Sequence, residues 1–63
     1  MKIKYNGVQE FNEGDIKKSF RLFTFIEGYL PNHGPNSTLS EGTLADYGFY
    51  IPAGLIPGDE IEI

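Results

Sequence analysis

The chain ends in Pro57-Gly58-Asp59-Glu60-Ile61-Glu62-Ile63, a turn followed by an alternating strand. Glycine and aspartate are typical of turns, and strict alternation of apolar with charged residues is typical of a strand that has one buried face. We therefore expect Ile61 and Ile63 to face the core and Glu60 and Glu62 to face water. A strand at this position is expected to be a member of a sheet and not a tail.

The opening of the chain predicts a hairpin that this last strand joins. Residues Met1–Tyr5 alternate in the same way, with Lys2 and Lys4 on the polar face. Asn6-Gly7 favours a two-residue type I′ turn, because both residues tolerate a positive φ. Val8–Phe11 would then return beside Met1–Tyr5. We expect Asp59–Ile63 to close the sheet on the other side of the opening strand.

The next segment carries conflicting signals. Asp15 is a plausible helix N-cap, and four apolar residues follow at helical spacing: Ile16, Phe20, Phe23 and Leu30. The aromatic and β-branched run Phe20–Ile26 favours a strand by local propensity. We predict a helix over Ile16–Glu27, because the hairpin needs an element to cover its apolar face, with Gly28 near the helix C-cap. Three phenylalanines are expected in the core: Phe11, Phe20 and Phe23.

The remaining segments are rich in turn residues. Leu30–Gly42 reads as a long, loose connection, and Thr43–Asp46 as a short strand or a turn. Tyr47–Pro52 is expected to be a turn that enters a short strand, which Pro52 ends or places at a sheet edge. The 63 residues form a single domain, 1–63, of the α+β class.

Charge is distributed unevenly along the sequence, whose formal net charge is −4. No lysine or arginine follows Arg21, whereas six carboxylates do: Glu27, Glu41, Asp46, Asp59, Glu60 and Glu62. This pattern indicates either a solvated acidic surface or an acidic face that steers a basic protein partner. Direct binding to nucleic acid is not expected, because phosphate contacts need clustered cations. No apolar run approaches the roughly 18 residues of a membrane span, and we expect a cytoplasmic protein.

Residues with catalytic or metal-binding potential are few. The chain has no cysteine, and His33 is its single histidine, so neither a metal site nor a cofactor is expected. Adjacent Asp59 and Glu60 would point to opposite faces of a strand, which is poor geometry for an acid–base pair. We therefore expect a protein that is not an enzyme and has no catalytic residues.

A protein contact is the site that the composition predicts. Four apolar residues near the end of the chain are expected to be partly exposed and to form a patch with an acidic rim, as protein interfaces do. The candidate partner-binding residues are Phe49, Tyr50, Leu55, Ile56, Glu60 and Glu62. The alternative is that the apolar members cover one end of a thin core.

The order of these elements resembles the ubiquitin-like β-grasp fold, and more narrowly the ThiS/MoaD sulfur-carrier family. The resemblance rests on four runs: Met1-Lys2-Ile3-Lys4-Tyr5-Asn6-Gly7, Asn12-Glu13-Gly14-Asp15, Tyr47-Gly48-Phe49-Tyr50-Ile51-Pro52 and Pro57-Gly58-Asp59-Glu60-Ile61-Glu62-Ile63. It implies an N-terminal hairpin, one helix and short C-terminal strands that close on the first strand. Members of the family carry a terminal Gly-Gly that is activated and thiolated, and this sequence ends at Ile63 without one.

Three functions follow as alternatives. The first is a small acidic protein-binding module that resembles a sulfur carrier without its reactive tail. The second is a sulfur carrier whose Gly-Gly tail is not part of this sequence. The third is a small acidic inhibitor of a nucleic-acid-binding protein, of the kind that mobile elements encode. A homodimer through the sheet edge at Asp59–Ile63 also remains open.

Overall fold

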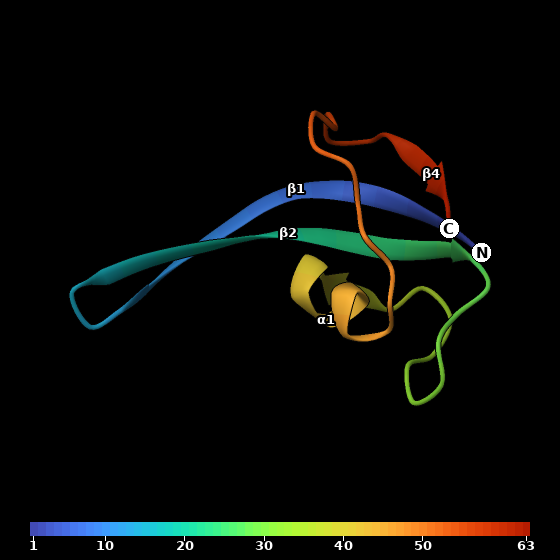
Figure 1. Cartoon of the computed structure of the whole chain (residues 1–63), viewed down its shortest axis with the longest axis horizontal. Coiled ribbons are helices and arrows are strands. Elements are labelled where there is room, and N and C mark those ends of the chain that lie inside the picture. The colour runs from blue at the N-terminus through green and yellow to red at the C-terminus, as the bar shows by residue number, and fades with distance from the viewer.

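Two long antiparallel strands, β1 (Lys2–Glu13) and β2 (Ile16–Glu27), form most of the fold (Figure 1). The computed structural model describes residues 1–63. Two short strands flank the pair: β3 (Thr38–Ser40) lies beside β2, and β4 (Glu60–Glu62) lies beside β1. The sheet order is β3-β2-β1-β4, and every pairing is antiparallel. With one helix, α1 (Glu41–Asp46), the chain is an α+β protein.

The closing strand lies where the sequence predicts it. Lys2, Ile3 and Lys4 of β1 pair with Glu62, Ile61 and Glu60 of β4. Ile61 and Ile63 pack against the core, whereas both glutamates are exposed. The Met1 carbonyl accepts the Ile63 amide at 2.8 Å, so the two chain ends lie side by side (Figure 1). The inward alternation of Met1–Tyr5 is also confirmed, since Ile3 and Tyr5 are buried.

The hairpin turn lies eight residues later than Asn6-Gly7. β1 runs through Asn6-Gly7 and reverses at Gly14-Asp15, where Gly14 has a φ of 64° and Asp15 keeps a negative φ. Glycine at the first central position is the signature of a type II′ turn, whose twist suits a hairpin. Asn6-Gly7 instead forms a bulge between the Tyr5–Phe23 and Gly7–Leu22 pairs, with a φ of 95° at Gly7.

The predicted helix over Ile16–Glu27 is wrong, because this segment is β2. Its alternation places Phe23 and Phe25 on the core side of the sheet, opposite Tyr5 and Ile3 of β1. Local β propensity and cross-strand pairing therefore prevail over the helical spacing. It follows that Asp15 is a turn residue and not an N-cap, and that Gly28 follows a strand.

The element that covers the sheet is α1, in a segment where a strand or a turn was expected. Ser40 caps this helix, because its hydroxyl oxygen accepts the Thr43 amide at 3.3 Å. Leu44, a residue of this helix, is fully buried in the core. The strand expected within Tyr47–Pro52 does not form. That segment leaves α1 with the Phe49 amide bonded to the Leu44 carbonyl at 3.0 Å and then crosses the same side of the sheet.

The core is small and lies between α1 and the end of the sheet that carries both chain termini. It contains seven buried residues: Ile3, Tyr5, Phe23, Phe25, Leu30, Leu39 and Leu44. Of the three phenylalanines predicted to be buried, only Phe23 is confirmed. Phe11 and Phe20 lie outside the core because they point to the opposite side of the sheet, on the part of the hairpin that extends past β3 and β4. No helix in the structure combines the length and apolar character that crossing a membrane requires.

Candidate interaction surface

The hairpin projects from the body of the protein as a two-stranded arm. β4 pairs only with Lys2–Lys4, and β3 pairs only with Leu22–Thr24. Residues 8–21 therefore have no third strand beside them, and we call this part of the hairpin the arm (Figure 1). The principal extents of 37 × 26 × 19 Å reflect this projection. An isolated two-stranded ribbon is only marginally stable in water, so the arm is the part of the fold that a partner would stabilise most.

One face of the arm, which we call the outer face, continues the side of the sheet opposite the core. Alternation from the buried Phe23 and Phe25 sets which side chains point this way. The outer face consists of Gln9, Phe11, Glu13, Ile16, Lys18 and Phe20. The rings of Phe11 and Phe20 pack against each other with centroids 5.4 Å apart.

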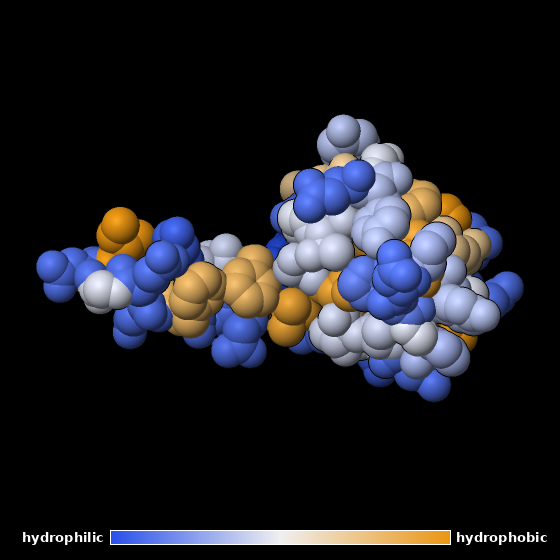
Figure 2. Space-filling view, turned by 90° about the horizontal axis from the view of Figure 1, so that it is seen from below, coloured by the Kyte–Doolittle hydropathy of each residue, from blue (hydrophilic) through white to orange (hydrophobic).

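Apolar side chains on the outer face are open to solvent. Phe11 is 40% exposed and Ile16 is 61% exposed, and Figure 2 shows apolar residues gathered along the arm. Single exposed apolar side chains are ordinary, but several on one uncovered ribbon mark a contact surface. The arm therefore presents apolar area that nothing in this chain covers.

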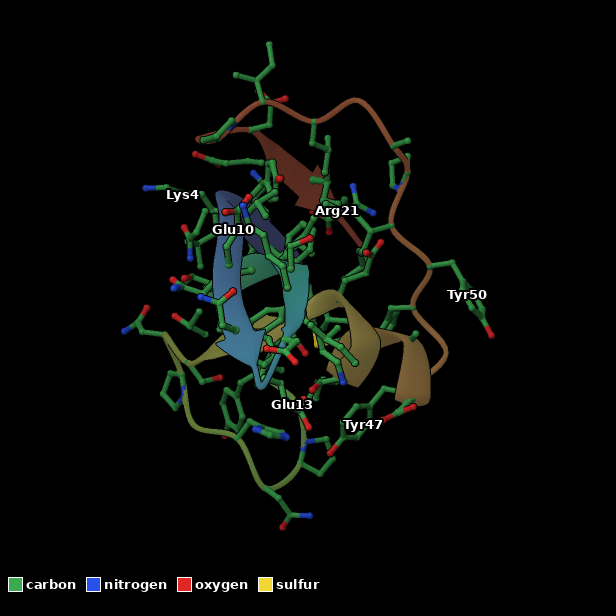
Figure 3. The ribbon with its side chains drawn as sticks, turned by 90° about the vertical axis from the view of Figure 1, so that its left-hand side faces the viewer. Lys4, Glu10, Glu13, Arg21, Tyr47 and Tyr50 are labelled. Atoms are coloured by element: carbon green, nitrogen blue, oxygen red, sulfur yellow. The ribbon has the colours of Figure 1, made fainter.

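Ion pairs neutralise the charges on both faces of the arm. Glu13 and Lys18 pair at 2.9 Å on the outer face, and Glu10 and Lys17 pair at 3.0 Å on the other face. Figure 3 looks at the molecule from the arm's end, with Glu10 and Glu13 labelled. All four side chains are well exposed, so each pair contributes at most about 1 kcal/mol to stability. Their effect on recognition is to leave an arm without a strong field of either sign.

Arg21 holds the base of the arm to the covering segment. Its guanidinium pairs with Glu41 of α1 and donates to the carbonyls of Pro52 at 2.8 Å and Ile51 at 3.1 Å. The side-chain hydrogen bond between the two groups raises the pKa of Arg21 and lowers the pKa of Glu41, in each case against a smaller desolvation effect. Arg21 also lies 5.8 Å from the centroid of the Phe23 ring. No local pattern predicts this anchor, because the partners of Arg21 lie 20 to 31 residues away in the sequence.

The residues predicted to form a C-terminal patch fall into two groups. Phe49 and Leu55 are partly buried and pack against the core, which matches the alternative in which they cover its end. Tyr50 and Ile56 are 83% and 68% exposed, and Figure 3 shows Tyr50 pointing away from the body. The patch residues therefore do not all share one exposed surface.

The acidic rim of that patch is interleaved with basic groups in space. Glu60 and Glu62 lie on β4 directly opposite Lys4 and Lys2 of β1. The Glu62 carboxylate is also 3.7 Å from the amino group of Met1. The separation of charge along the sequence is thus largely removed when β1 and β4 pair.

The remaining polar side chains pack locally. The His33 ring lies edge-on to Tyr47, with centroids 5.9 Å apart, and the Tyr47 hydroxyl donates to the Pro31 carbonyl at 3.3 Å. No group of three or more His, Asp or Glu side chains is placed to hold a metal ion, and the surface contains no detectable pocket.

The arm is the feature that sequence reasoning missed, although a signal for it exists. Gly14-Asp15 lies between β1 and β2, and glycine followed by aspartate is a type II′ hairpin signal. Asp15 also fits the N-cap of a helix, and that interpretation competes with the turn signal. No family model, curated protein or solved structure matches this chain.

Proposed function

We propose that this protein is a non-enzymatic module that binds another protein through the outer face of its arm. One observation carries the proposal: Phe11, Phe20 and Ile16 lie on one face of a ribbon that has no covering layer. Burying that surface would remove apolar area from water and also supply the covering layer that the ribbon lacks. Aromatic side chains at the centre of a contact commonly carry most of its binding energy.

A protein is the partner that the chemistry of the arm favours. The rings of Phe11 and Phe20 are flanked by the Glu13–Lys18 pair, which gives an apolar centre with a polar margin. This is the ordinary anatomy of a protein–protein contact. The lysines on the arm are paired with carboxylates, which leaves little free positive charge for a phosphate backbone.

Capture of a partner by paired surface variants tests the proposal. Phe11→Ser and Ile16→Ser alter the arm, and Tyr50→Ala and Ile56→Ser alter the C-terminal surface as matched exposed controls. We expect the arm variants to weaken capture by about 5- to 30-fold, the usual effect of truncating a central contact residue. Thermal melting of each variant establishes that the body remains folded. Capture that depends on Tyr50 and Ile56 but not on the arm would contradict this assignment.

The sulfur-carrier resemblance contributes a proposal about fold type and a second candidate function. The opening hairpin and the place of β4 beside β1 are shared with a β-grasp arrangement, but β4 runs antiparallel to β1, whereas the first and last strands of that fold run parallel. The segment Ile16–Glu27, where that arrangement needs its helix, is a strand. The carrier alternative therefore rests on the two ends of the chain. Incubating the full gene product with an adenylating enzyme and ATP, and measuring its mass, would test it.

A further inference from the structure

The outer edge of β1 is free along the arm. The two-residue turn makes Glu13–Ile16 a hydrogen-bonded pair, so the backbone groups of alternate residues Val8, Glu10 and Asn12 point away from β2. None of these three residues takes part in a backbone hydrogen bond outside regular secondary structure. The Glu10 carbonyl receives only the neighbouring Gln9 side chain, at 3.4 Å. A row of unpaired backbone groups of this kind is a template for another strand.

We propose that a second copy of this chain occupies that edge, with the two β1 strands antiparallel and related by a two-fold axis at Phe11. This dimer rests on the proposed role of the arm as a contact surface, and it has a single register. Glu10 lies opposite Asn12 of the second copy, and the reciprocal pair forms on the other side of the axis. Glu10 and Asn12 are the residues with outward-pointing backbone groups, so these two pairs hydrogen-bond across the new ladder.

Side-chain complementarity supports this register. With Phe11 opposite its own copy, Gln9 lies opposite Glu13, so each carboxylate on the strand faces an amide side chain. Opposite residues in an antiparallel pair share a face, so Phe11 and Phe20 of both copies form one continuous aromatic cluster. The result is a four-stranded sheet made from two ribbons that are marginal alone.

Neighbouring registers of the same edge are less favourable. Moving the axis to Glu10 places two carboxylates directly opposite each other. The same shift brings the turn of the second copy, Gly14-Asp15, opposite Asn6 and Tyr5, where the backbone amide and carbonyl of Tyr5 are already bonded to Asp59 and Gly58. Moving the axis to Asn12 places Phe11 opposite Glu13 and shortens the ladder.

The outer edge of β2 is a poorer site for a second copy. An axis at Ser19 places Lys17 opposite Arg21 of the second copy, which sets two cations against each other twice. Lysines on an exposed strand are a common device against pairing at an edge. The charges of the arm therefore select β1 over β2. The free edge of β1 along the arm is only six residues long, residues 8–13. The dimer interface is therefore small, and we expect the dimer to dissociate on dilution.

Two substitutions at one residue test the proposal with opposite signs. Asn12→Asp places a carboxylate opposite Glu10 of the second copy and should weaken the dimer by about 2- to 30-fold over its two symmetric sites. Asn12→Lys places an ammonium there and should strengthen it by a similar factor. The effects on the stability of the arm within one chain have the opposite sign, because Asn12 lies opposite Lys17 of β2. Asp at position 12 would stabilise the arm, and Lys would destabilise it. Sedimentation velocity of the purified variants over a concentration series measures the dissociation constant.

Cysteine cross-linking tests the register, since the chain has no cysteine of its own. Phe11→Cys places the two sulfurs at a non-hydrogen-bonded pair, whose Cα separation of about 4.5 Å suits a disulfide. Ser19→Cys is the matched control, at the centre of the rejected β2 pairing. We expect a covalent dimer from the first under mild oxidation and little from the second.

Three outcomes overturn the inference: a monomer at every concentration, Asn12 effects of the reversed sign, or preferential cross-linking through Ser19. These measurements use the purified chain alone. A negative result therefore leaves capture of a different protein by the outer face untouched. Failure of the capture experiment, in turn, leaves the dimer result standing.

Discussion

Replacing Arg21 with methionine should detach the segment that covers the core from the base of the arm. The guanidinium pairs with Glu41 and donates to the carbonyls of Ile51 and Pro52. Methionine keeps much of the stem but supplies no donor, so two carbonyls and one carboxylate lose their partner. The change therefore isolates the polar anchor from simple packing.

The contacts of Arg21 give the size of the effect. An ion pair between partly exposed groups contributes about 0.2–1 kcal/mol, and each hydrogen bond to a carbonyl contributes about 1 kcal/mol net. Together they predict a loss of about 2–3 kcal/mol in the free energy of unfolding. A chain of 63 residues has about 3–9 kcal/mol in total. At about 4–8 °C per kcal/mol, the melting temperature should fall by roughly 10–20 °C.

Thermal unfolding followed by circular dichroism measures this loss. Lys17→Met is the matched control, because Lys17 lies on the same strand and its pair with Glu10 is well exposed. We expect that control to change stability by no more than about 0.5 kcal/mol. Amide exchange should rise selectively in residues 49–56 of the Arg21 variant. Equal melting temperatures for the two variants would refute the role assigned to Arg21.

Three further predictions follow from other parts of the structure. Because its folded-state pKa is lowered, Glu41 contributes stability that is present above its ordinary value of 4.5 and lost as pH falls through the folded-state pKa. Denaturation curves of the wild type and Glu41→Gln should therefore differ at pH 7 and converge in acid; a constant difference would count against the pair. Leu44→Ala should cost about 2–5 kcal/mol, because Leu44 is fully buried, and a melt within a few degrees of wild type would contradict its place in the core. Gly14→Ala forces a positive φ on an L-residue and should cost about 1 kcal/mol, with NMR shift changes confined to the arm; changes spread through the core would argue against the turn assignment.

The two ends of the chain could be predicted because their patterns admit one interpretation. In Met1–Tyr5 and Glu60–Ile63, apolar and charged residues alternate without interruption. A shift of one residue would bury the charged set, so the buried face fixes the register once the strands pair. The observed pair of Ile3 with Ile61 agrees with this argument, which requires inward-facing residues of the two strands to lie opposite each other.

The secondary structure of Ile16–Glu27 could not be predicted from the sequence, because its apolar residues fit both the helical and the strand period. Ile16, Phe20 and Phe23 match a helix, whereas Phe23 and Phe25 match a strand. The long partner strand decides between them, since β1 continues past Asn6-Gly7 and pairs along nearly the whole of β2. A local reading places the turn at the stronger dipeptide signal. In the structure the turn lies at Gly14-Asp15, between two strands of twelve residues each.

The candidate site escaped prediction for a related reason, which is the assumption that phenylalanine marks the core. Phe11 and Phe20 lie on the outer face of the arm, opposite the core side of the sheet, so their apolar area lies outside the seven-residue core. Two rules of stable folds are thereby broken in one place: apolar rings are left uncovered, and strand edges are left unpaired. Elsewhere the chain obeys both rules, with α1 over the sheet and short charged β4 at its edge. Local departures of this kind concentrate at functional positions, because the stability they forgo in the free chain is regained when a partner binds.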